Sequence, residues 1–485
     1  MPPQYADDPF HNGEWQEVLQ DFPTFYAAVR HTQVPESLCH LIYRAIMHTP
    51  QLDAAQERMN ELFSTPPSFD DFVAHIRTLK NNSGPGPSGC SYNMIKSWPD
   101  ITKRAAYDCL TQFWTDKHIP IHWKWRWLVP APKKPTDTPL MADLRPLMLT
   151  EATRKTWISL ILSKIRTITK SLNMFNTSQH GYVPGRGTMS ASLLFINILE
   201  TAKMDNGVSN RTSYDMSKAF DTVSKNLQKI AWSRLGVPTE IVNWLADMDT
   251  DGVTVVRSPH ALAQWTVQDY RSVQTDLQPN SPPQLQTPTV TPFTAVRGTG
   301  QGNPDSPTCW NAAFDIALTA LKLDAEDRGA EQYSTGKDGN SIIGSEIGYA
   351  DDLVSVHELA TEIQRKADIM SAFCAICGVT LSHKKLRRVV QSWVGQQRIT
   401  SPLTMTVHDY GWIPVDITIK TDGATDYLGG IYDTDDSGIT SHTTIQNISK
   451  QHATVLSTVR ASPETILMCY SIATICLYCQ WEVGG

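Results

Sequence analysis

Tyr349-Ala350-Asp351-Asp352 is the segment from which the architecture of this chain is best predicted. Strand-like runs flank it, Ile347-Gly348-Tyr349 before and Leu353-Val354-Ser355-Val356 after, so a tight hairpin should present two adjacent carboxylates. An isolated Asp-Asp pair would indicate only an exposed turn, but the two flanking runs argue against that interpretation. The sequence therefore predicts a functional turn between two paired strands.

A second carboxylate segment stands far upstream, Tyr214-Asp215-Met216-Ser217. A short strand is expected over 212–216, which places Asp215 at a strand end. If this strand joins the hairpin, Asp215, Asp351 and Asp352 form one acidic cluster. Carboxylate clusters of this kind suit Mg²⁺ and two-metal phosphoryl transfer.

Length and composition predict a mixed fold. The chain has 485 residues, enough for two to four structural units, and 41% are hydrophobic, enough for a sizeable core. Helices and strands interleave without a βαβ rhythm, which favours the α+β class. Helices are expected over 151–169, 190–203, 225–235, 307–325 and 361–377, and strands over 123–129, 253–257 and 293–297. The last two strands should pair across a Pro/Gln-rich insert at about 269–291.

Charge is unevenly distributed along the chain. The net charge is −7, yet the windows 117–136, 152–199 and 369–408 contain basic residues and no acidic ones. Such segregation suits a basic channel on an acidic body. The alternative is that each window is an ordinary solvated helix face.

Cysteine usage and hydropathy point to an intracellular protein, nuclear or cytoplasmic. The nine cysteines are scattered, and no signal peptide opens the sequence, so a reduced compartment is expected. The Cys-x-x-Cys pairs at Cys374/Cys377 and Cys476/Cys479 lie in apolar, helix-like runs, which favours core packing over a metal site. The apolar run over 466–481 is shorter than the ~20 residues of a membrane span. We therefore expect neither a metal-binding cysteine site nor an association with a membrane.

A glycine-rich loop, Arg297-Gly298-Thr299-Gly300-Gln301-Gly302-Asn303, opens onto the predicted helix 307–325. It allows close backbone approach and offers N–H groups to a phosphate or base.

These segments together resemble the reverse transcriptase domain of LINE-type (non-long-terminal-repeat) retrotransposons, which is related to group II intron reverse transcriptases. The resemblance runs from about Gly84 to the C-terminus. Besides the two carboxylate segments and Gln301-Gly302, the matching motifs are Gly84-Pro85-Gly86, Val129-Pro130-Ala131-Pro132-Lys133-Lys134, Leu144-Arg145-Pro146-Leu147, Gln179-His180-Gly181-Tyr182-Val183-Pro184-Gly185-Arg186, Gly378-Val379-Thr380-Leu381 with Lys384-Lys385, and Tyr427-Leu428-Gly429-Gly430.

The resemblance implies a right-hand polymerase fold of the α+β class, with an antiparallel palm sheet that carries the catalytic carboxylates. Residues 1–75 would be an N-terminal helical extension, 76–210 the fingers with palm elements, 211–435 the palm, and 436–485 partial thumb helices.

It also implies roles for individual residues. Asp215, Asp351 and Asp352 match the catalytic, metal-binding carboxylates, and Lys385 matches a lysine placed to protonate or neutralise the departing pyrophosphate. Nucleotide binding falls to Lys133, Arg145, Gln301, Gly302 and Phe220, the last as the bulky residue that rejects a ribose 2′-OH. Arg186, Tyr427, Leu428 and Gly429 match residues near the primer and template.

The implied function is that of a retrotransposon RNA-directed DNA polymerase. It would need two Mg²⁺ ions, with Mn²⁺ as an alternative ion, and would bind an RNA template, a DNA or RNA primer and dNTPs. Two alternatives stay open: an RNA-directed RNA polymerase, and a non-catalytic or decayed RNA-binding protein. Ala350 and Phe220 argue against the first, since such enzymes usually carry Gly-Asp-Asp and a polar sugar contact. Retention of all three aspartates argues against the second. The sequence departs from the family pattern at Asp305 and at Thr308-Cys309-Trp310, where apolar residues are usual.

Overall fold

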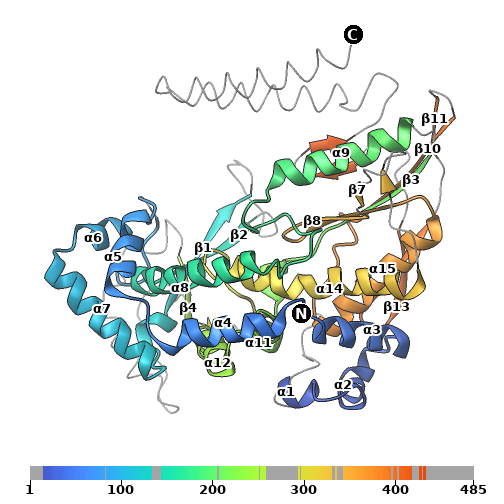
Figure 1. Ribbon diagram of the computed structural model, residues 1–485. Coiled ribbons are helices and arrows are strands. Elements are labelled where there is room, and N and C mark those ends of the chain that lie inside the picture. Colours follow the sequence, from blue (N-terminus) through green and yellow to red (C-terminus); the bar gives the residue numbers. More distant parts are fainter. Residues whose placement is uncertain are drawn as a thin grey trace, which may run out of the picture.

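The computed structural model describes residues 15–81, 83–133, 144–204, 207–250, 252–257, 293–294, 297–329, 334–335, 342–343, 345–394, 397–400, 404–417, 425–428 and 430–432 (Figure 1). The predicted insert 269–291, the thumb segment 436–485, Lys134, Gly429 and the pair Cys476/Cys479 lie outside these residues.

The central element is an antiparallel sheet of five strands in the order β11-β10-β3-β9-β8. Its strands are β3 (Val208–Tyr214), β8 (Glu346–Tyr349), β9 (Asp352–His357), β10 (Arg387–Val394) and β11 (Gln397–Thr400). The Tyr349–Asp352 pair closes the β8–β9 hairpin, and β3 pairs directly with β9. The pairing expected between the strand before Asp215 and the hairpin is therefore confirmed.

Helices cover both faces of this sheet. In Figure 1, α9 (Thr188–Met204) lies on one side, and α14 (Ser306–Arg328) and α15 (Ala360–Cys377) lie on the other. The period-2 alternation of β9 divides its side chains between the two layers. Leu353 belongs to the main core, whereas Val354 and Val356 pack with Phe195 of α9. The strand ends that carry the carboxylates are thus held by packing on both faces of the sheet.

A smaller sheet, in the order β2-β1-β4-β5, stands beside α8 (Ala152–Ser171). Its strands are β1 (Arg126–Pro132), β2 (Leu144–Thr150), β4 (Val253–Val256) and β5 (Phe293–Thr294). The antiparallel pairing of β4 with β5 confirms the predicted hairpin. The strand predicted over 123–129 begins three residues late. Residues Ile121–Lys124 form a 3₁₀ turn, because buried Trp123 points its indole Nε1 at the Thr153 hydroxyl, 3.2 Å away.

The other described elements are mostly helical. They are α1 (Trp15–Val18), α2 (Phe22–Val29), a 3₁₀ turn (Arg30–Thr32), α3 (Glu36–Met47), α4 (Leu52–Ser64), α5 (Phe69–Thr78), α6 (Tyr92–Ser97), α7 (Asp100–Thr115), α10 (Ala219–Thr222), α11 (Lys225–Arg234), α12 (Thr239–Asp247), and the strand pairs β6 (Ser334–Thr335) with β7 (Ile342–Ile343), β12 (Met405–Asp409) with β13 (Ile413–Ile417), and β14 (Thr425–Tyr427) with β15 (Gly430–Tyr432).

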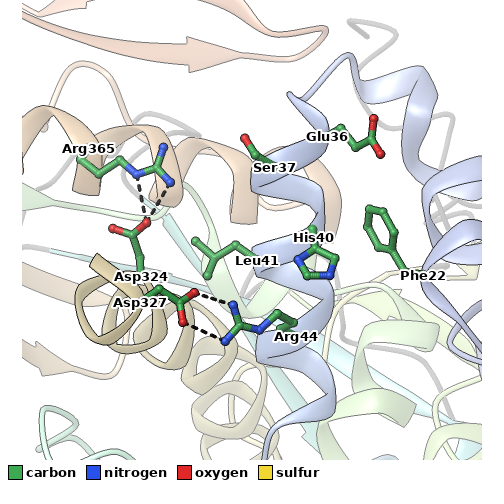
Figure 2. Close-up of a pocket in the computed structure, with 9 residues that line it drawn as sticks. All are labelled: Phe22, Glu36, Ser37, His40, Leu41, Arg44, Asp324, Asp327 and Arg365. Atoms are coloured by element: carbon green, nitrogen blue, oxygen red, sulfur yellow. Dashed lines mark hydrogen bonds and ion pairs between the residues drawn. The ribbon is translucent and has the colours of Figure 1, made fainter. Parts of the chain in front are cut away.

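The N-terminal helices pack on the ends of α14 and α15. Helix α3 contacts both, and Arg44 of α3 makes two hydrogen bonds to Asp327 of α14, while Arg365 of α15 binds Asp324 (Figure 2). These ion pairs line an open polar pocket of about 430 Å³. The pocket shares no lining residue with the cavity beside Asp215 described below.

Arg126, Arg154, Lys155 and Arg388, four of the basic residues in the acid-free windows, are buried and so cannot line the predicted basic channel. Arg126 and Arg154 both bind the carboxylate of Asp249, Lys155 donates to the Gly84 carbonyl oxygen, and Arg388 donates to the Thr404 carbonyl oxygen. Their charges stabilise the interior rather than face a ligand.

Cys374 and Cys377 are buried on α15, as the packing interpretation predicted, and burial raises the pKa of the Cys374 thiol. In the described part of the chain, no helix combines the length and the hydropathy that a membrane span requires.

Candidate active site

Asp215 directly follows β3 and lies beside the β8–β9 turn. The register pairs Tyr214 with Leu353, so the next position along β3 comes level with Asp352. The backbone is fixed from the other side, since Ser382 N–H donates to the Asp215 carbonyl oxygen at 2.8 Å. The two segments predicted to meet therefore do meet.

The three carboxylates act on one another electrostatically. Burial raises the pKa of Asp352 to about 6, and the negative charges of Asp351 and Asp215 add to the shift. Burial also raises the pKa of Asp351, again with a contribution from Asp215. Like charges held together in a poorly hydrated site disfavour full ionisation. The cluster thus carries repulsion that a bound cation would relieve.

The ammonium group of Lys385 offsets part of this negative charge. Its Nζ lies 3.0 Å from both carboxylate oxygens of Asp215, while its side chain is 66% exposed. The two residues border a cavity of about 240 Å³, which is lined by Ser213, Asp215, Asp352, Lys385, Arg387, Tyr427 and Leu428. A cationic group therefore reaches the carboxylates from an open cavity.

The donor set fits a hard divalent cation. Carboxylate oxygens are the ligands that Mg²⁺ prefers. The raised pKa values of Asp351 and Asp352 show that their ionised forms are disfavoured, and a bound cation would stabilise those forms. Among the described residues, however, no three acidic, histidine or cysteine side chains already stand in a ligand arrangement. Since Lys385 holds Asp215, binding a cation there requires that ion pair to yield.

The turn itself is held by a residue that the sequence analysis quoted only within a motif, Gln179. Its amide makes hydrogen bonds to both the N–H and the carbonyl oxygen of Ala350. Gly181 lies so close that a Cβ there would stand 2.3 Å from the Ala350 nitrogen. The only sequence signal was the glycine two positions after the glutamine.

The glycine-rich loop packs against β2. Met148 N–H donates to the Gln301 carbonyl oxygen at 2.6 Å, and Gly302, at φ 106°, leaves no room for a Cβ, which would lie 2.8 Å from the Met148 carbonyl oxygen. The Gln301 side chain donates to Asp221 Oδ2 at 3.2 Å. Gln301 and Gly302 thus join the loop to the segment that follows Asp215.

Asp221 is a second residue that sequence reasoning passed over. Burial raises the pKa of its carboxyl to about 6, and the nearby positive charges of Lys218 and Lys133 oppose the rise. The structure therefore brings predicted nucleotide-binding residues Lys133 and Gln301 to one carboxyl group.

Phe220 is half-buried, with its ring centroid 5.8 Å from that of buried Trp310. Trp310 stacks in turn on Phe314, so the departure from the family pattern at this helix is accommodated by aromatic packing. Lys133 and Arg145 are exposed at the same end of the β1–β2 hairpin, where Ala131 pairs with Arg145.

The predicted primer and template residues divide into two groups. Tyr427 is buried against Phe195 and donates its hydroxyl to the Ile347 carbonyl oxygen, while Leu428 lines the cavity with Asp215. Arg186 donates to the carbonyl oxygens of Asn176 and Gln179 and so braces the loop beneath the turn. Only the first group borders the cavity.

Comparisons with known proteins agree with this geometry. Residues 131–429 match the family model described as reverse transcriptase (RNA-dependent DNA polymerase). The Pol polyprotein of the type-1 retrotransposable element R2 of Popillia japonica is 24% identical over 272 residues, 55% of this chain and 32% of that protein. An uncharacterized 149 kDa protein of transposon TX1 from Xenopus laevis is 20% identical over 334 residues, 69% of this chain and 23% of that protein.

The chain spans a third or less of the length of these curated relatives. Among solved structures, apo telomerase of Candida tropicalis superposes with a TM-score of 0.35 at 11% identity, covering 58% of this chain and 46% of that one, a likeness too weak to add to the argument. The family match covers more than half of the chain and contains the three aspartates, and the retrotransposon relatives are those that the motifs predicted. The chain belongs to the reverse transcriptase (RNA-dependent DNA polymerase) family.

Proposed function

We propose that this chain copies an RNA template into DNA, as the polymerase of a retrotransposon. The observation that carries the proposal is the meeting of Asp215, Asp351 and Asp352 at one sheet edge beside an open cavity, within a chain of this family. A pure binding role would not require three mutually repelling carboxylates to be kept together.

In this proposal Asp215, Asp351 and Asp352 hold two divalent ions, Mg²⁺ or Mn²⁺. Such ions lower the pKa of the primer 3′-hydroxyl and offset charge on the triphosphate and the departing pyrophosphate. Lys385, whose exposed side chain pairs with Asp215, would be placed to neutralise the departing pyrophosphate. Positioning and charge compensation by these residues provide most of the rate acceleration.

The incoming dNTP would lie between the carboxylates and the β1–β2 hairpin. Lys133 and Arg145 contact its phosphates, and Gln301 and Gly302 its base and the template. Phe220 excludes a 2′-hydroxyl, and Tyr427-Leu428-Gly429 supports the primer end. In right-hand terms, the five-stranded sheet would be the palm, and β1 and β2 with their neighbouring helices would belong to the fingers, with boundaries near residues 76, 211 and 436. Strands β4 and β5 come from the 211–435 segment, so the smaller sheet combines strands of both parts.

Primer extension tests the proposal. Wild-type protein with an RNA template, a labelled DNA primer, Mg²⁺ and either dNTPs or rNTPs should extend the primer with dNTPs only. Asp351→Asn should lower extension by about a thousandfold or more, because a metal ligand is lost, while template affinity stays within about twofold. The matched control is Asp247→Asn, which alters an exposed carboxylate at the end of α12.

Each alternative has its own outcome. Preferred use of rNTPs would identify an RNA-directed RNA polymerase. Template binding without any extension, in wild type and Asp351→Asn alike, would identify a non-catalytic RNA-binding protein.

A further inference from the structure

The backbone of Ala350 is held by one buried side chain. Gln179 is completely buried, and its amide faces the β8–β9 turn. Its Oε1 accepts from Ala350 N–H at 2.9 Å and from Gly181 N–H at 2.8 Å, and its Nε2 donates to the Ala350 carbonyl oxygen at 3.2 Å. Both polar groups of the Ala350 peptide are thus paired with the same amide.

Ala350 needs such support because its conformation is unfavourable. Its φ is 58°, in the left-handed region, where a residue with a Cβ costs roughly 1–2 kcal/mol. Two-residue hairpin turns usually meet this requirement with glycine or asparagine. Here Ala350 and Asp351 form the turn, so an interaction outside the hairpin has to offset the cost.

The segment that carries Gln179 is itself fixed to the hairpin. Gly348 N–H donates to the Ser178 carbonyl oxygen at 2.8 Å, and His180 N–H donates to the Gly348 carbonyl oxygen at 2.7 Å. Residue 179 therefore runs beside β8 in a parallel bridge. Arg186 anchors the other side through the Gln179 carbonyl oxygen.

We propose that Gln179 is a positioning residue for catalysis, which holds the turn so that the two following carboxylates face Asp215. This inference rests on the proposed function, because it takes the carboxylates as the metal-binding groups. In this role Gln179 is not a metal ligand; it acts through its hydrogen bonds to Ala350, while its bond from Gly181 N–H fixes its own amide.

The variants follow from the contacts. Gln179→Met keeps the volume and removes every hydrogen bond to the turn. Gln179→Glu keeps the acceptor oxygens but sets a buried carboxylate against the Ala350 carbonyl oxygen, so it should disturb the turn at least as much as Gln179→Met. Ala350→Gly removes the conformational cost and should rescue the Gln179 variants. Gln391→Met is the control: Gln391 is also completely buried, but it lies on β10 and pairs with Arg211.

Two readouts do not require activity. Hydrogen–deuterium exchange of the peptide over 347–353 should speed up by about tenfold or more in Gln179→Met, because Ala350 N–H loses its acceptor. Binding of Mn²⁺ alone, followed by the electron paramagnetic resonance signal of the free ion, should weaken by about tenfold. The loss of Mn²⁺ affinity should be largely reversed in Gln179→Met/Ala350→Gly, whereas exchange over 347–353 should stay faster than in wild type, because the residue 350 N–H still lacks its acceptor. Gln179→Glu should change both readouts at least as much as Gln179→Met. The Gln391→Met control should shift thermal stability and leave both readouts at the turn unchanged.

Kinetics then separate positioning from substrate binding. The kcat of primer extension should fall by about tenfold or more in Gln179→Met, with the dNTP KM and template affinity within about twofold. A folded Gln179→Met protein with wild-type exchange at 347–353 and wild-type Mn²⁺ affinity would overturn the inference. A loss of Mn²⁺ affinity or of kcat in Gln179→Met that the added Ala350→Gly change does not reduce would also overturn it.

The Asp351→Asn variant distinguishes failure of this inference from failure of the proposed function. If Asp351→Asn weakens Mn²⁺ binding and Gln179→Met does not, the proposed metal site is supported and the positioning role of Gln179 is refuted. If Asp351→Asn leaves Mn²⁺ binding unchanged, the metal site itself is wrong, and exchange at 347–353 still decides whether Gln179 holds the turn.

Discussion

At the scale of single residues, the ring of Phe220 offers the sharpest test of substrate choice. It is half-buried against Trp310 and lies shortly after Asp215 in the chain, and we propose that it borders the nucleotide sugar. Phe220→Ala should raise rNTP incorporation relative to dNTP incorporation by at least about tenfold, because the steric barrier to a 2′-hydroxyl is removed. Competitive primer extension measures the ratio, and Phe220→Tyr, which keeps the bulk, is the control. Unchanged selectivity in Phe220→Ala would refute this role.

Asp221 provides a pH test. Burial raises the pKa of its carboxyl from 3.8 to about 6, so the folded chain binds this proton more tightly than the unfolded chain. The resulting stabilisation is fully present below pH ~4 and is lost as the pH rises through about 6. Asp221→Asn cannot become charged. The free energy of unfolding of this variant, relative to that of wild type, should therefore rise by on the order of 2 kcal/mol between pH 4 and pH 7.5.

Urea unfolding at the two pH values, with a chelator present, measures that change. Asp247→Asn is again the control, because solvent surrounds its carboxylate. A difference between Asp221→Asn and wild type that does not depend on pH would show that the carboxyl is not held in a poorly hydrated site.

Residue identities predicted part of the site. Asp215, Asp351 and Asp352 stand out because strand-like runs flank them, and the register then brings them together. Gln179 and Asp221 could not be singled out, since a glutamine or an aspartate inside a motif carries no mark of its partner. Their importance comes from Ala350 and Gln301, which are distant in sequence and close only in the fold.

At the scale of elements, strongly periodic helices were predicted within a few residues, as with 361–377 against the observed α15 (Ala360–Cys377). The predicted start of β1 was wrong because the Trp123 indole donates a hydrogen bond to Thr153 of α8. The alternation of residue types along one segment does not reveal a contact with another element. The order of the five-stranded sheet was not predicted, and the family resemblance implied only an antiparallel palm sheet that carries the carboxylates. Local propensity does not specify which strands pair.

One buried arginine ties several elements together and allows a test at this scale. Arg234 of α11 donates to the carbonyl oxygens of Ala45, Ile46 and His48 at the end of α3 and binds Asp315 of α14 at 2.8 Å. Arg234→Met should destabilise the chain by about 3–5 kcal/mol, because Asp315 becomes an unpaired buried charge. Arg234→Met/Asp315→Asn should recover part of the loss in urea unfolding. Equal destabilisation by the single and double variants would show that the lost carbonyl contacts, not the charge, dominate.

At the scale of the whole molecule, the acid-free windows contain both buried and exposed cations, which the sequence alone does not separate. Arg126, Arg154 and Arg388 are interior groups with carboxylate or carbonyl partners. Lys384 and Lys385 are exposed basic residues near the site. Exposed groups such as these, rather than the buried arginines, are the candidates for attracting a template.

Salt dependence of RNA binding tests which cations face the template. The affinity of wild-type protein for a single-stranded RNA should fall linearly on a log–log plot against salt, and Lys384→Gln should reduce the slope by ~0.7, the contribution of one phosphate contact. Lys322→Gln is the matched control, because this lysine is also exposed but lies on α14 near the ion pairs with the N-terminal helices. Equal slopes for Lys384→Gln and wild type would place the RNA path away from the carboxylate edge of the sheet, since Lys384 adjoins the lysine that holds Asp215.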